Sequence, residues 1–257
     1  MLGRKLLRDI IDNKVQFVSI FLMALLSSYI FVGMSSLWYG LQNNRDEYYK
    51  KCNYADYIVT CTNGFDSADL EKLLKNKDIE NVQGRYSIKG IGINEKNSSI
   101  DVHILKENRL SKSIIIEGNE FDINQDGVWL DYRYAKSNKL SVGDIFSVQI
   151  ENFIISKKIK GLVINPEYIY QLNNYSVIPN HIDYGFLYMP FNSVNSIDNN
   201  KINTILIKMK EGKILKSNDI YNYIDKDVII KRAEEKQQIE LWLEKQEKFH
   251  QGFSSDL

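Results

Sequence analysis

The sequence contains few of the residues that build metal sites and disulfide frameworks. Of its 257 residues only two are cysteine, three are histidine and three are proline, and 33 basic residues are balanced by 33 acidic ones. So few cysteines exclude a disulfide-dense secreted fold. A net charge of zero provides no bulk attraction to nucleic acid, so we expect no nucleic-acid partner.

The sequence also lacks the motifs of common enzymes. His103, His181 and His250 are far apart and fit no metal-ligand spacing, so we expect surface or hydrogen-bonded residues. Gly212 and Lys213 lack the earlier glycine and the hydroxyl of a phosphate-binding loop, and no G-x-S-x-G sequence occurs. We therefore expect a protein that is not an enzyme, and we predict no catalytic, cofactor-binding or metal-binding residue.

One short segment resembles half of a calcium-binding loop. Asp122 to Gly127, DINQDG, matches the first six positions of an EF-hand loop, but the bidentate glutamate is replaced by Arg133. A cation at that position repels calcium, and the following GVWLD is typical of a strand. We predict an Asx-rich turn here.

The two cysteines, Cys52 and Cys61, leave two alternatives open. In an exported domain they can form one disulfide that closes a short loop, or they can remain unpaired and half-buried. Neither alternative changes the functional interpretation.

The sequence has one long apolar run, close to its N-terminus. Residues 15–41 hold 27 positions, and no charged residue occurs between Lys14 and Arg45. A helix of that length spans about 40 Å, whereas a bilayer core needs about 20 apolar residues. The run is about twice as long as the apolar region of a signal peptide. We predict a transmembrane helix over 15–41, with Trp38 and Tyr39 at one membrane interface.

The residues that flank this run indicate its orientation. Residues 1–14 predict an amphipathic cytoplasmic helix, with Leu2, Leu6 and Ile10 on the face opposite its basic side chains. Four basic residues precede the span and three follow it, so we place the N-terminus in the cytoplasm and everything after residue 41 outside. The abundance of Ile, Lys and Asn, with 34, 26 and 25 residues, indicates a low-GC Gram-positive source.

The exported part alternates between short strands and helices. A stalk at 42–54 leads to a domain at 55–231, and a stalk helix is predicted at 232–257. YADYIVTC, GFDSADLEKLLKNK and DIENVQGRYSIKGIGIN form one β-α-β unit, with Leu70, Leu73 and Leu74 on one face of its helix. INTILIKMK, SNDIYNYI and DVIIK form a second unit. The class is therefore α+β, with two β-α-β halves flanking a β-rich subdomain inserted at 96–199.

Two stretches resemble the FtsX-like, MacB-type permeases of ABC transporters. The segment RKLLRDIIDNKVQFVSIFLMALLSSYIFVGM is similar to their cytoplasmic lead helix and first transmembrane helix. The segment EGNEFDINQDGVWLDYRYAKSNKLSVGDIFSVQI is similar to their extracytoplasmic core, with a strand ending at Leu130-Asp131 and a turn from Leu140 to Asp144. A strand ending in a turn that contains Gly161 follows.

The resemblance implies that ATP hydrolysis and movement of the outer domain belong to different subunits. A separate cytoplasmic ATPase dimerises on ATP, and the permease, in the lipid bilayer as a homodimer or part of a larger assembly, carries the movement to its outer domain. Such permeases have at least four spanning helices, so we expect either an N-terminal fragment or a truncated homologue. The alternative is a single-pass, membrane-anchored sensing or binding module.

Overall fold

A computed structural model describes residues 11, 13–93, 97–169, 180–194, 201–215 and 217–233. The chain divides into two compact units, residues 1–48 and 49–257. The predicted amphipathic helix at 1–14 and the predicted stalk helix at 232–257 lie almost entirely outside the described residues, as does His250.

The first unit is dominated by one long helix, α2 (Lys14–Lys51). It has no acidic residue in its first turn, carries Lys50 and Lys51 in its last turn, and buries none of its side chains. It is long and apolar enough to cross a membrane, with a mean hydropathy of 2.1 over its most apolar 18 residues. The residues predicted as a stalk at 42–54 continue this helix as far as Lys51.

The second unit is an α+β domain built on a mixed sheet, which confirms the predicted class. Four strands and two helices form its first half: β1 (Tyr57–Phe65), α3 (Ser67–Leu74), β2 (Ile79–Gly92), β9 (Ile202–Met209), α5 (Ser217–Tyr221) and β10 (Ile229–Arg232). These strands are antiparallel neighbours in the order β10-β1-β9-β2. This is the order of a β-α-β-β-α-β motif whose second and third strands are separated by a long stretch of chain.

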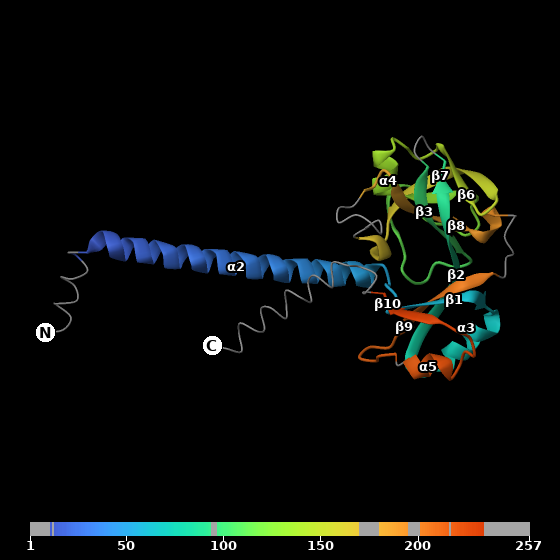
Figure 1. The fold of residues 1–257 in the computed structure, drawn as a ribbon, viewed down its shortest axis with the longest axis horizontal. Helices are drawn as coiled ribbons and strands as arrows, with labels where there is room; N and C mark the ends of the chain where they lie inside the picture. The colour runs from blue at the N-terminus through green and yellow to red at the C-terminus, as the bar shows by residue number, and fades with distance from the viewer. Residues whose placement is uncertain are drawn as a thin grey trace. The chain divides into compact units, whose positions relative to one another are not determined.

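That long stretch forms the second half of the domain (Figure 1). Its elements are β3 (Ser98–Leu105), β4 (Ile114–Gly118), β5 (Val128–Asp131), α4 (Tyr132–Ser137), β6 (Ile145–Ile150), β7 (Phe153–Ile164), η1 (Pro166–Tyr168), β8 (Tyr184–Pro190) and η2 (Phe191–Ser193). The sheet continues from β2 through β3, β8, β5 and β7 to β4, and β6 pairs with β2 and β7. The pairs β3–β8 and β5–β7 are parallel, and each is joined through a long connection.

Strand β2 belongs to both halves. Its first part pairs with β9 from Ile79 to Arg85, and its second part pairs with β3 from Arg85 to Gly92. Val82 and Tyr86 lie four positions apart and therefore on the same face of β2, but in different parts of the strand. Val82 is buried with α3 and α5, whereas Tyr86 is buried with the strands of the second half.

Two main hydrophobic cores result. One lies between the four-stranded half and the helices α3 and α5, around Val59, Leu73, Ile205 and Ile220. The other lies within the second half, around Ile100, Leu130, Tyr134 and Leu187. Of the leucines predicted on one face of α3, Leu73 is fully buried, whereas Leu74, the last residue of the helix, is 50% exposed.

Candidate functional site

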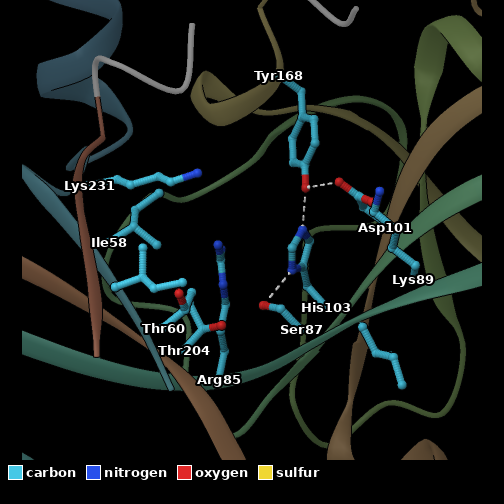
Figure 2. Close-up of a pocket in the computed structure, with 12 residues that line it drawn as sticks. Ile58, Thr60, Arg85, Ser87, Lys89, Asp101, His103, Tyr168, Thr204 and Lys231 are labelled. Atoms are coloured by element: carbon cyan, nitrogen blue, oxygen red, sulfur yellow. Dashed lines mark hydrogen bonds between the residues drawn. The ribbon is translucent and has the colours of Figure 1, made fainter. Parts of the chain in front are cut away.

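A pocket of about 300 Å³ opens on the face of the sheet opposite α3 and α5. It is bounded by β1, β2, β3, β9, β10 and the η1 turn, so both halves of the domain contribute to it. Its lining residues, most of which Figure 2 labels, are Ile58, Thr60, Arg85, Ser87, Ile88, Lys89, Asp101, His103, Tyr168, Thr204, Ile229 and Lys231. Among the described residues, the strands present both polar and apolar side chains to the pocket.

A chain of hydrogen bonds crosses one wall of the pocket (Figure 2). His103 Nδ1 lies 2.9 Å from Ser87 Oγ, and its Nε2 lies 2.5 Å from the Tyr168 hydroxyl. Tyr168 donates to Asp101 Oδ2 at 3.1 Å, and Tyr184 donates to the same oxygen at 2.7 Å. Because the single proton of Tyr168 goes to Asp101, the His103 Nε2–H donates to Tyr168.

The two phenols in this chain remain protonated. Burial, followed by the nearby Asp101 carboxylate, raises the pKa of Tyr168 well above its usual value, and the same two causes raise the pKa of Tyr184. A deprotonated phenol beside this carboxylate is disfavoured by like charge. Both hydroxyls are therefore fixed donors at physiological pH.

A buried ion pair supports the η1 turn. Arg85 on β2 and Glu167 in η1 form two parallel hydrogen bonds of 2.7 Å, with side-chain exposures of 3% and 0%. Burial alone lowers the pKa of Arg85, but the Glu167 carboxylate outweighs it and raises that pKa. The guanidinium Nε is buried and has no hydrogen-bond acceptor among the described residues.

Two asparagines position the backbone around this pair. Asn165 Oδ1 accepts from the Glu167 amide at 2.8 Å and its Nδ2 donates to the Ser111 carbonyl at 2.7 Å, which fixes the start of η1. Asn203 exchanges two hydrogen bonds, of 2.7 and 2.8 Å, with the Ser87 carbonyl and amide. The backbone pairing of β2 with β9 ends at Arg85. Beyond that point, the side-chain amide of Asn203 provides the hydrogen bonds to β2.

The Ser87–His103–Tyr168–Asp101 chain contains the residue types of a nucleophile and its base. An acyl-transfer site also needs donors aimed at a developing oxyanion. Here the Ser87 amide donates to Asn203, and each terminal nitrogen of Arg85 donates one hydrogen bond to Glu167, so the groups next to Ser87 are engaged in holding the sheet and η1 together. We interpret the chain as a satisfied polar network that joins β2 and β3 to η1.

The turn that contributed to the family resemblance has the expected geometry. Gly143 has φ +101°, a conformation open to glycine, and its amide donates to the Ile159 carbonyl at 2.9 Å. Asp144 Oδ2 accepts from the Ser141 amide at 2.8 Å. The turn thus sets the start of β6 against β7. Asp131, at the end of β5, is the N-cap of α4 and accepts from the Arg133 amide.

The interpretation of Gly161 as a turn residue was wrong. It lies within β7 and pairs with Gly118 on β4 and Trp129 on β5. A Cβ at this position meets the Trp129 ring at 2.7 Å and the Asn119 carbonyl at 2.8 Å. Because Gly161 has no side chain, the buried indole of Trp129 fits against β7. The indole nitrogen also donates to the Asn119 carbonyl.

The remaining candidates from the sequence are dispersed. In the DINQDG segment Asp122 Oδ1 accepts from the Asn124 amide, as in an Asx turn, and no possible metal cluster occurs among the described residues. Cys52 and Cys61 are both buried, and they form no disulfide with each other. His181 is partly buried near Arg133; burial, and then that charge, lower its pKa.

The sequence matches no family model, and it matches no curated protein. The fold is similar to a crystal structure of the periplasmic region of MacB from Actinobacillus actinomycetemcomitans, at 16% identity and TM-score 0.44, over 76% of this chain and 95% of that chain. It is also similar to the extracellular domain of the noncanonic ABC-type transporter YknZ from Gram-positive bacteria, at 12% identity and TM-score 0.43, over 66% and 88%.

A third similar structure is a domain of a putative permease protein from Porphyromonas gingivalis, at 10% identity and TM-score 0.36, over 70% of this chain and 87% of that chain. The structural matches are thus with domains of the kind that the sequence motifs resemble.

Proposed function

We propose that this chain supplies the first transmembrane helix and the extracytoplasmic domain of an FtsX/MacB-type ABC transporter permease. In this role a separate cytoplasmic ATPase hydrolyses ATP, and the permease converts the ATPase movement into displacement of the outer domain. The movement serves export or remodelling of the cell envelope. The N-terminus lies in the cytoplasm, and residues after 41 lie outside the membrane.

The observation that carries the proposal is one apolar helix followed by a domain whose two halves share strand β2. The helix α2 has the length and hydropathy of a membrane span. The domain contains the Leu140–Asp144 turn and the Leu130-Asp131 strand end in the order of the family resemblance. The order of these features in one chain supports a permease more specifically than any one of them does.

The rigidity of the domain supports a mechanical role. The Arg85–Glu167 pair and the Ser87–His103–Tyr168–Asp101 chain are buried or part-buried, and both join strands of the sheet to the η1 turn. Hydrogen-bonded networks of this kind hold a single arrangement. A domain that transmits force needs a single rigid conformation. A domain whose strands and turns were loosely joined would deform under the force instead of moving as a unit.

Co-purification tests the proposal. The full chain, tagged at its C-terminus and expressed in its own host, is solubilised in mild detergent and the proteins recovered with it are identified by mass spectrometry. We expect an ATPase that carries a phosphate-binding loop, and a cross-link between it and residues 1–14. An unrelated single-pass protein with the same tag is the control.

The alternative is a single-pass, membrane-anchored sensing or binding module. The pocket of about 300 Å³ favours it, because a domain that only transmits force has no need of a lined cavity. Recovery of the tagged chain without any ATPase, in several mild detergents, would favour this alternative over the permease.

A further inference from the structure

We propose that the pocket between the two halves of the domain binds a small anionic ligand, in which a carboxylate or phosphate group is joined to a short apolar chain. This inference goes beyond the proposed transport role and does not depend on it, because it concerns recognition by the outer domain alone. It follows from the charges, the free donors and the apolar walls of the pocket.

The charged side chains of the pocket favour an anion. Lys89 on β2 and Lys231 on β10 both line it and are exposed, and neither ammonium group has an ion-pair or hydrogen-bond acceptor among the described residues. Asp101 is the one acidic residue in the lining, and its Oδ2 already accepts from two phenols. Two lysines against one engaged carboxylate leave the pocket with an excess of positive charge.

Arg85 supplies one further donor to the pocket. Figure 2 shows the Arg85 side chain between the Thr60 and Thr204 side chains on one side and His103 on the other. The guanidinium is held by Glu167, while its buried Nε lacks an acceptor among the described residues. A buried donor without an acceptor costs stability, and an anionic oxygen is the acceptor that suits a guanidinium best.

The apolar walls indicate the rest of the ligand. Ile58, Ile88 and Ile229 line the same pocket, and Ile229 is 60% exposed although it is a large apolar side chain. A volume of about 300 Å³ is at the small end of the range for ligand sites. The pocket therefore fits a ligand with one charged group and a short apolar chain better than it fits a bare inorganic ion or a folded partner.

Titration calorimetry with the full chain in mild detergent tests the proposal. The probes are hexanoate, hexyl phosphate, inorganic phosphate and the uncharged hexanamide, each at the same ionic strength. We expect saturable binding of hexanoate, hexyl phosphate or both, and weaker binding of inorganic phosphate and hexanamide. The ratio between the first two probes identifies the anionic group that the pocket prefers.

A charge variant links this binding to the pocket. In the double variant Lys89→Gln and Lys231→Gln both lysines become uncharged, and the affinity for the best probe should fall about tenfold or more, because two charge-assisted contacts to the anion are lost. The matched control is Lys75→Gln with Lys77→Gln, which removes two exposed charges at the end of α3, outside the pocket lining. This control should bind like the original chain.

Three outcomes would overturn the inference. They are the absence of saturable binding by either organic anion, equal affinity for hexanoate and hexanamide, and unchanged affinity in the Lys89→Gln and Lys231→Gln variant. Because both lysines are exposed and engage no described acceptor, the variant is expected to fold, and its circular dichroism spectrum and melting temperature verify this. Loss of ATPase co-purification leaves these results unaffected, so the two proposals fail separately.

Discussion

At the scale of single residues, the buried charges of Arg85 and Glu167 dominate the energetics of the site. Each charge loses its hydration on burial, and the two parallel hydrogen bonds of 2.7 Å compensate for that loss. Such a pair contributes little net stability compared with an apolar replacement, yet a single missing partner leaves an uncompensated charge. The pair therefore specifies the position of η1 more than it adds stability.

Arg85→Met should lower the free energy of unfolding by about 3–5 kcal/mol, because it leaves the Glu167 carboxylate buried without its cation. The double variant Arg85→Met with Glu167→Met should recover most of this loss. The measurement is urea denaturation of the full chain in mild detergent, followed by intrinsic fluorescence.

The control for this prediction is Glu117→Gln at the surface pair of Lys136 and Glu117, whose side chains are 50% and 41% exposed. It should change the free energy of unfolding by less than about 1 kcal/mol. A loss in the Arg85→Met variant as small as that of the control would contradict the assigned role of the pair.

At the scale of elements, α3 is attached to the loop before β10 by one lysine. Lys226 Nζ lies 2.7 Å from Asp69 Oδ2 and 3.1 Å from Asp66 Oδ2, and it also donates to the Gly64 carbonyl. Asp69 Oδ2 additionally accepts from the Asp66 amide at the N-terminus of the helix. Asp69 therefore joins the helix start to a segment more than 150 positions later in the chain.

Replacement of Asp69 by asparagine should alter the acid sensitivity of the domain. Burial raises the pKa of Asp69, but the hydrogen bond and charge of Lys226 outweigh burial, and the folded-state pKa is lowered. The stabilisation is therefore complete above the unfolded-state pKa of about 3.9 and is lost as the pH falls through the lower, folded-state value.

Unfolding measured between pH 6 and pH 2 should accordingly show a steeper loss of stability on the acid side in the original chain than in Asp69→Asn. Asp78→Asn, at a pair with Lys213 in which both side chains are about half exposed, is the control. Parallel curves for the original chain and Asp69→Asn would show that the Lys226 contacts do not shift this carboxyl in solution.

A second prediction at this scale concerns β7. Gly161→Ala places a Cβ 2.7 Å from the Trp129 ring, so we expect a loss of about 1–3 kcal/mol in the free energy of unfolding of the domain. Gly40→Ala in α2, where no atom lies within 4 Å of the added Cβ, should leave domain unfolding unchanged. Equal unfolding curves for the two variants would contradict the close packing of β7 on Trp129.

The sequence predicts the individual strands better than it predicts which distant residues come into contact. Alternating apolar residues predict β1, and short apolar runs predict β9 and β7, because such patterns depend only on local backbone geometry. The pairs Arg85–Glu167 and His103–Tyr168 join residues 82 and 65 positions apart, and they form only once the register of β2, β3 and η1 is set. Gly161 was misassigned for the same reason, since the constraint on it comes from Trp129 on another strand.

At the scale of the whole molecule, the testable claim is the side of the membrane on which the domain lies. The native thiols of Cys52 and Cys61 are buried, so the original chain provides a low background for thiol labelling. Lys75→Cys and Lys112→Cys introduce thiols at exposed positions of the domain. In intact cells, both should react with a membrane-impermeant maleimide.

The original chain, treated in the same way, is the control for this labelling. Labelling of Lys75→Cys and Lys112→Cys only after cell lysis would place the domain in the cytoplasm and would contradict the permease proposal. An N-terminal sequence of the membrane-bound protein that starts beyond Leu41 would contradict it as well, because the span would then have been removed.

The continuity of strand β2 affects how the domain responds to an applied force. Its 14 residues extend over about 45 Å, and each half of the domain hydrogen-bonds to a different part of the same backbone. A hinge between the halves would have to bend that continuous backbone near Arg85, where the side chain of Asn203 takes over from strand pairing. We therefore expect the two halves of the domain to move together as one rigid body. A ligand bound in the pocket beside β2 would change how strongly this body resists deformation.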